Sequence, residues 1–189
     1  MNNWLLSGAA VGADLLFDKC AKEVGHFRTH FSFKGHNVAC SENVVILNEN
    51  QLHLADIYLQ QANIYLKRKW PTTNPFTNCL LERNYYQIKD SNKIYAITFR
   101  ESNGHIKGGT AWAVMMGILR GMTEIYVFDQ NTNNWYSFKN FDKEKNIIEW
   151  NIIPYAPYPS NKYTGIGSRD LRPNGIDAIR YLYNLREIK

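Results

Sequence analysis

Long hydrophobic runs are missing from this 189-residue chain, and their absence excludes a membrane-spanning protein. The longest apolar stretch, residues 110–119, is too short to cross a bilayer and is interrupted by Gly117. The first residues carry no basic segment, which argues against a secretory signal peptide. From these absences we expect no membrane partner and a cytoplasmic location.

Cysteine is also scarce, with three residues at positions 20, 40 and 79 and no Cys-x-x-Cys pair. An odd number without regular spacing fits reduced thiols in a cytosol better than a disulfide framework. The histidines at positions 26, 30 and 36 precede Cys40, but their spacing matches no standard zinc pattern. The sequence therefore predicts neither disulfides nor a metal site.

Basic residues are in excess, giving a net charge of +5, but they form no dense stripe. The one run, residues 67–69, falls at the end of a helical pattern, where positive charge complements the helix dipole. This balance favours an anionic partner and disfavours nucleic acid. The chain also has no Walker lysine and no Gly-x-Ser-x-Gly elbow, which excludes two common enzyme classes.

Helical and strand patterns alternate along the chain. Apolar spacing predicts helices over residues 13–24, around 54–66, and over 78–89, 111–120 and 174–186. Short apolar strands are predicted at residues 4–6, 26–33, 93–99, 124–130 and from 163, and a peripheral antiparallel pair at 134–140 and 146–153. The proline-rich connector at 155–163 is too short to divide the chain. We expect one α/β domain over residues 1–189, Rossmann-like, three-layered and built on a mainly parallel sheet.

The two ends of the chain complete each other. Residues 163–189 followed by 1–24 read as strand, glycine turn, helix, strand, glycine turn and helix, which is a βαβ unit cut open at its link. The sequence therefore predicts a circularly permuted domain. In it the strands around Leu5 and Thr164 are adjacent and parallel, and the termini lie on the same side.

Glycine turns follow three of the predicted strands, at Gly8 and Gly12, at Gly108 and Gly109, and at Gly165 and Gly167. Parallel strands end at one edge of a sheet, where backbone N–H groups of helix N-termini can bind an anion. Hydroxyls beside the turns and the Arg169 guanidinium suit phosphate, and Asp14 either accepts from a ribose hydroxyl or caps its helix. We expect an anionic, nucleotide-like ligand at this edge.

Three further positions have two interpretations each. Arg83 and Asn84 either form a polar surface or reach the ligand, and Asp129 contacts a ribose or caps a turn. The predicted ligand-binding residues are Ser7, Gly8, Ala9, Gly12, Asp14, Arg83, Asn84, Lys107, Gly108, Gly109, Thr110, Asp129, Gly165, Gly167, Ser168 and Arg169.

The stretches SGAAVGAD (7–14), KGGTAWAV (107–114) and YTGIGSRD (163–170) resemble the signature turns of the SLOG superfamily. Their order resembles its circularly permuted YpsA-like branch, which includes phage-encoded forms, and the resemblance covers essentially the whole chain. It implies a nucleotide-derived ligand such as NAD, ADP-ribose or a cyclic ADP-ribose. It also implies a homodimer or higher homo-oligomer and, for a phage protein, the host cytoplasm.

LOG-type members of that superfamily are phosphoribohydrolases that use a glutamate after the glycine turn. Alignment places Met115 or Ala113 at that position, and neither side chain can act as an acid or base. The resemblance therefore implies a protein that sequesters a nucleotide signal, such as a phage anti-defence sponge, with no catalytic residue assigned. Two alternatives stay open: an N-glycosidase using Asp14, Glu82 or Asp129, and a molybdenum-cofactor carrier.

Overall fold

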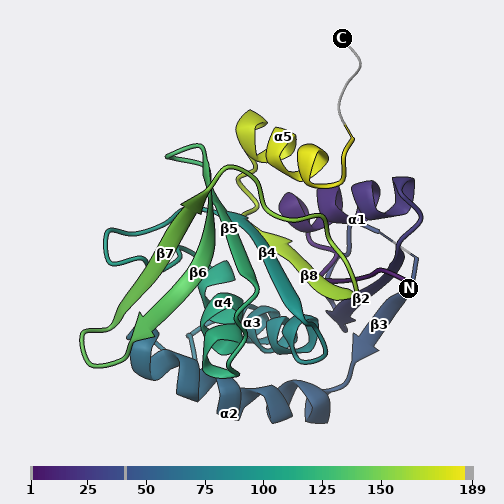
Figure 1. The fold of residues 1–189 in the computed structure, drawn as a ribbon. Helices are drawn as coiled ribbons and strands as arrows, with labels where there is room; N and C mark the ends of the chain where they lie inside the picture. The colour runs from purple at the N-terminus through teal and green to yellow at the C-terminus, as the bar shows by residue number, and fades with distance from the viewer. Residues whose placement is uncertain (1, 41, 186–189) are drawn as a thin grey trace.

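One eight-stranded sheet runs through the computed structural model, which describes residues 2–40 and 42–185 (Figure 1). The strands, in chain order, are β1 (Trp4–Ser7), β2 (Phe27–Phe33), β3 (Val44–Leu47), β4 (Lys93–Thr98), β5 (Ile125–Asp129), β6 (Asn134–Asp142), β7 (Ile147–Ile153) and β8 (Lys162–Gly167). Their order across the sheet is β3-β2-β1-β8-β4-β5-β6-β7. In this order across the sheet, the six strands from β3 to β5 are parallel, and β6 and β7 add antiparallel pairs at one end. The predicted α/β fold with a mainly parallel sheet is confirmed.

Helices cover both faces of the sheet and complete a three-layer, Rossmann-like domain (Figure 1). One face carries α1 (Ala13–Glu23) and α5 (Pro173–Leu182), and the other carries α3 (Pro75–Ile88) and α4 (Thr110–Leu119). The long α2 (Glu49–Leu66) packs on the outside of α3 and α4. Each face therefore has its own apolar core, one containing Phe17 and Ile179 and the other Leu59 and Met115.

The last strand of the chain lies in the middle of the sheet, between β1 and β4. Leu6 is opposite Thr164 in β8, and Thr164 is opposite Ile94 in β4, both in parallel register. The predicted adjacency of the two end strands is confirmed, as a βαβ unit cut at its link requires. The prediction about the termini falls on Met1 and residues 186–189, which lie outside the described residues.

Two helix starts differ from the sequence prediction, because one asparagine cap was placed at residue 78 and the cap at Asn48 was not recognised. α3 begins at Pro75 and not at residue 78, since the Asn74 side chain accepts from the backbone N–H of Phe76 and Thr77. Proline at the first helical position favours this start. α2 begins at Glu49, where Asn48 and Gln51 form a reciprocal capping box. Strand β3, which immediately precedes that box, was not predicted.

The final helix is shorter than predicted. α5 ends at Leu182, and Asn184 adopts a left-handed backbone with φ 58°. Such a residue after a helix ends its hydrogen-bond ladder, because the next peptide no longer follows the helical path. The last residue of the predicted helix, Arg186, lies outside the described residues.

Gly165 allows α1 to approach the centre of the sheet. An added Cβ there would lie 2.5 Å from Phe17 and 2.9 Å from Leu5. We expect Gly165→Ala to lower the free energy of unfolding by about 1–3 kcal/mol through overpacking, measured by urea denaturation. Gly109→Ala is the control, because its nearest new contact is Leu81 at 3.6 Å. Equal stability in the two variants would contradict this account of the β8–α1 contact.

Candidate functional site

A cavity of about 400 Å³ lies at the edge of the sheet where β1, β4 and β8 end. Residues of all three predicted glycine turns line it. The predicted residues among its walls are Asp14, Arg83, Asn84, Lys107, Gly108, Gly109, Thr110, Gly167, Ser168 and Arg169. The sequence argument that three turns meet at one edge therefore describes a real concavity.

The cavity lies where the chain leaves two neighbouring strands in opposite directions. α4 follows β4 on one face of the sheet, and α5 follows β8 on the other (Figure 1). The loops after these strands diverge and leave a crevice between them, which is the usual ligand position in open parallel sheets. The topology thus accounts for the cavity without any special feature of the loops.

Backbone hydrogen bonds join the first and third turns into one unit. The Ala13 N–H donates to the Ser168 carbonyl at 3.2 Å, and the Ser168 N–H donates to the Ile97 carbonyl at 2.8 Å. The Gly167 N–H donates to the Asp14 carboxylate at 3.1 Å. Asp14 therefore connects α1 to the end of β8, and its side chain faces the cavity from there.

Polar side chains of α3 connect the first turn to the second. The Arg83 guanidinium donates to the Gly8 carbonyl, and the Asn84 amide donates to the Gly109 carbonyl at 3.3 Å. Both side chains are buried, with exposed fractions of 5% and 4%. The interpretation of these residues as a polar surface is therefore wrong. Arg68, just after the end of α2, also contacts the second turn and donates to the Gly108 carbonyl at 2.6 Å.

Positive charge exceeds negative charge around the cavity. Arg83, Lys107 and Arg169 line it together with one carboxyl group, Asp14. Burial lowers the pKa of Arg83, although Asp14 opposes this shift and Arg169 adds to it. The Nε atom of Arg83 is buried without a hydrogen-bond partner. This electrostatic arrangement favours an anion in the cavity.

Two helices that begin at the glycine turns, α1 and α4, have no side-chain cap. Gly12 precedes α1, and Gly109 precedes α4. Asparagines cap α2 and α3, and the first turn of α3 adds Thr77 to the cavity wall, whereas α5 has no side-chain cap and does not line the cavity. Uncapped backbone N–H groups at a helix start are donors for an anionic ligand. At α1 the Ala13 N–H is already engaged, so α4 is the stronger candidate.

Six predicted residues do not line the cavity: Ser7, Gly8, Ala9, Gly12, Asp129 and Gly165. Gly12 is a packing position, because an added Cβ would lie 2.6 Å from the Ser168 carbonyl oxygen. Asp129 caps its turn by accepting from the Asn131 N–H and the Thr132 hydroxyl, both at 3.1 Å. Ser7 is fully buried, and its hydroxyl has no partner. Gly12 and Asp129 therefore have structural roles, one in packing against the third turn and the other in capping the turn after β5.

Sequence reasoning missed the apolar and hydroxyl-bearing part of the wall. It consists of Ala10, Thr77, Leu80, Leu81, Thr98, Phe99 and Ile166. Thr98 and Phe99 are the last residues of the strand predicted at 93–99, so the rule that ligands bind at strand ends would have identified them. The α3 residues had no such signal, since Thr77 was assigned to a loop. The wall therefore combines polar turns with an apolar helix face.

The Asp14 carboxyl makes a testable contribution to the pH dependence of stability. Burial raises its pKa above 3.8, although Arg83 and the N–H groups of Gly167 and Gly8 oppose the shift. At pH values between 3.8 and the raised pKa, the Asp14 carboxyl group is deprotonated in the unfolded chain and protonated in the folded chain. The stability of the wild type relative to Asp14→Asn should therefore fall as pH rises through that window, by at most about 1.4 kcal/mol per unit.

Urea unfolding at several pH values measures this difference, with Asp142→Asn as the control. Hydrogen bonds from the Lys145 backbone lower the pKa of Asp142. The stability of the wild type relative to Asp142→Asn should therefore rise with pH, and this rise should occur at pH values below 3.8. A pH-independent difference for Asp14→Asn would contradict the assignment of a buried, cavity-facing carboxyl group.

The chain matches no protein-family model, no curated protein and no solved structure. Within residues 2–40 and 42–185, no helix combines the length and the apolar character needed to cross a membrane. The functional conclusion therefore rests on the cavity: its position at the strand ends, its excess of positive charge and the glycine-started helix α4 in its wall.

Proposed function

We propose that the cavity binds a nucleotide-derived small molecule and holds it without turnover. The observation that carries this proposal is the buried Arg83 guanidinium at a cavity that the start of α4, which has no side-chain cap, also lines. Such a site provides a fixed positive charge and free backbone donors to phosphate oxygens. Lys107 and Arg169, both exposed, add charge at the mouth.

The size and lining of the cavity favour a small ligand. A volume of about 400 Å³ is within the usual range for small-molecule sites. Leu80, Leu81, Phe99 and Ile166 add apolar surface to the lining beside the charged groups. A lining that combines apolar surface with positive charge suits the base and ribose of a nucleotide better than inorganic phosphate alone.

The arrangement of carboxyl groups favours binding over hydrolysis. Met115 and Ala113, the two possible positions of the family glutamate, are both buried in the apolar core. Glu82 and Asp129 do not line the cavity, which leaves Asp14 as its sole acidic side chain among the described residues. Because general acid–base catalysis contributes about 10²–10⁴-fold, a site without a free acid should turn over little.

The resemblance to the SLOG superfamily narrows the ligand class to ADP-ribose and cyclic ADP-ribose derivatives. A protein that retains such a signal intact would act as a sponge, in a phage setting against host defence. The second candidate is an N-glycosidase with Asp14 as general acid. One observation favours it, because burial raises the pKa of Asp14 and so favours its protonated form.

Arg169→Ala should weaken ligand binding because it removes a charge-assisted contact at the mouth. Calorimetry with ADP-ribose and with cyclic ADP-ribose should show a loss of about 1.5–3 kcal/mol in binding free energy. Lys139→Ala is the matched control, since it removes an exposed cation on β6 outside the cavity. If a folded Arg169→Ala variant bound as tightly as the wild type, the site would have to be elsewhere.

The fate of the ligand distinguishes a sponge from a hydrolase. We expect stoichiometric protein to deplete cyclic ADP-ribose from solution, and heat denaturation to release it unchanged, one molecule per site. Chromatography of the released material provides the measurement. Water added across one N-glycosidic bond would open the ring to linear ADP-ribose, and linear product that accumulates beyond one equivalent and disappears with Asp14→Asn would establish the hydrolase instead.

A further inference from the structure

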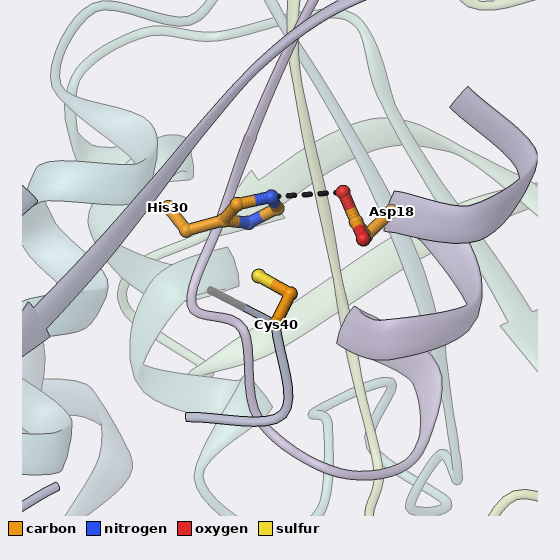
Figure 2. Close-up of side chains that lie close together, drawn as sticks. All are labelled: Asp18, His30 and Cys40. Atoms are coloured by element: carbon orange, nitrogen blue, oxygen red, sulfur yellow. Dashed lines mark hydrogen bonds and ion pairs between the residues drawn. The ribbon is translucent and has the colours of Figure 1, made fainter. Parts of the chain in front are cut away.

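A second cluster of polar side chains lies away from the cavity, between α1 and β2 (Figure 2). Asp18 comes from α1, His30 from β2 and Cys40 from the segment after β2. A carboxylate oxygen, a ring nitrogen and the thiol sulfur of these residues lie within 4.8 Å of one another. None of the three residues lines the nucleotide cavity.

The hydrogen bonds of His30 leave one ring nitrogen available. Nε2 lies 2.9 Å from an Asp18 carboxylate oxygen, to which Arg28 also donates at 2.9 Å. A carboxylate oxygen that accepts both bonds requires the proton on Nε2. In the neutral ring Nδ1 then carries a lone pair, and this atom is buried without a hydrogen-bond partner in a fully buried side chain. Figure 2 shows this nitrogen on the Cys40 side of the ring.

We propose that His30 Nδ1 and Cys40 Sγ ligate a borderline metal cation such as Zn²⁺, with Asp18 orienting the imidazole. Metal-bound histidine commonly donates its other N–H to a carboxylate, which is the arrangement of His30 and Asp18 here. Nitrogen and sulfur donors select Zn²⁺ over Mg²⁺ or Ca²⁺, which prefer oxygen. Cys40 is only half-buried, so water or an added donor can complete the coordination.

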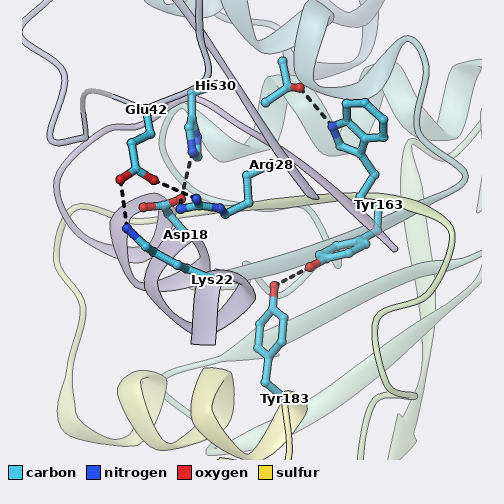
Figure 3. Close-up of polar contacts among 9 residues, drawn as sticks. Asp18, Lys22, Arg28, His30, Glu42, Tyr163 and Tyr183 are labelled. Carbon is cyan, nitrogen blue, oxygen red and sulfur yellow. Dashed lines mark hydrogen bonds and ion pairs between the residues drawn. The ribbon is translucent and has the colours of Figure 1, made fainter. Parts of the chain in front are cut away.

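The charged groups around the cluster are already paired. The Arg28 guanidinium donates to Asp18 at 2.9 Å and to Glu42 at 2.8 Å, and Lys22 donates to Glu42 at 2.9 Å (Figure 3). Two cations therefore balance two carboxylates, and neither carboxylate is free for a hard cation. The donor atoms that remain are the imidazole lone pair, which has no partner, and the thiol sulfur, which accepts from the Glu42 backbone N–H. This pair favours a metal with affinity for sulfur.

A bound cation would also fix the segment after β2 next to the first glycine turn. The Ala39 N–H donates to the Ala9 carbonyl at 2.8 Å, one residue before Cys40. The metal would therefore connect α1, β2 and this segment, and a cation that binds only the folded chain stabilises it. This proposal does not depend on the nucleotide ligand.

Cobalt titration of the metal-free, full-length protein tests the proposal. We expect one equivalent of Co²⁺ to produce a thiolate-to-cobalt charge-transfer band, which added Zn²⁺ removes. Cys40→Ser should abolish the band and the rise in melting temperature with Zn²⁺. Asp18→Asn should weaken binding about 10–100-fold, as expected for a carboxylate behind a ligating histidine.

Cys79→Ser is the matched control, because it removes another half-buried thiol that is not in the cluster. It should leave the band unchanged. His30→Gln can still donate to Asp18 but lacks the second ring nitrogen, so it should also lose the band. If His30→Gln does not fold, the half-buried Cys40→Ser decides alone. No band in the wild type, or a band that persists in Cys40→Ser, would overturn the proposal.

Discussion

The buried guanidinium of Arg83 is the interaction on which the site depends. It lies inside the protein without an ion pair among the described residues, and it donates to the Gly8 carbonyl and toward Asn84. A charge removed from water is costly unless hydrogen bonds and opposite charge compensate it. Here Asp14 and the turn carbonyl provide part of this compensation, and the Nε–H of Arg83 has no partner among the described residues. The anion proposed for the cavity would supply the remaining opposite charge.

The glycines act around that charge in two different ways. Gly12 and Gly165 permit close packing, against the third turn and against Phe17 respectively, and they bring β1, β8 and α1 together. Gly109 precedes α4 where no side-chain cap is present, so the helix start stays open to the cavity. A serine or asparagine cap at this position would satisfy the same N–H groups internally. Glycine therefore allows close packing at two positions and leaves the α4 start without a side-chain cap at a third.

The sequence was most informative where local pattern and global topology agree. The βαβ unit through β4, α4 and β5 follows from a buried strand, a glycine turn and an apolar helix, and the adjacency of β1 and β8 follows from the two chain ends. β3 was missed because Val44–Leu47 is short and its strand character depends on pairing with β2. The cluster of Asp18, His30 and Cys40 has no regular spacing along the chain. Only tertiary packing brings it together.

The role of Asp14 decides between holding and cleaving a ligand. A general acid must give its proton to the leaving group, and its oxygen must be free to approach that group. One oxygen of Asp14 instead accepts from the Gly167 N–H, a bond that fixes the end of β8 beneath the cavity. A hydrogen bond from a backbone N–H stabilises the carboxylate and so opposes the protonated form that burial favours. Asp14 therefore fits a side chain that positions the turns and balances Arg83 better than one that transfers a proton.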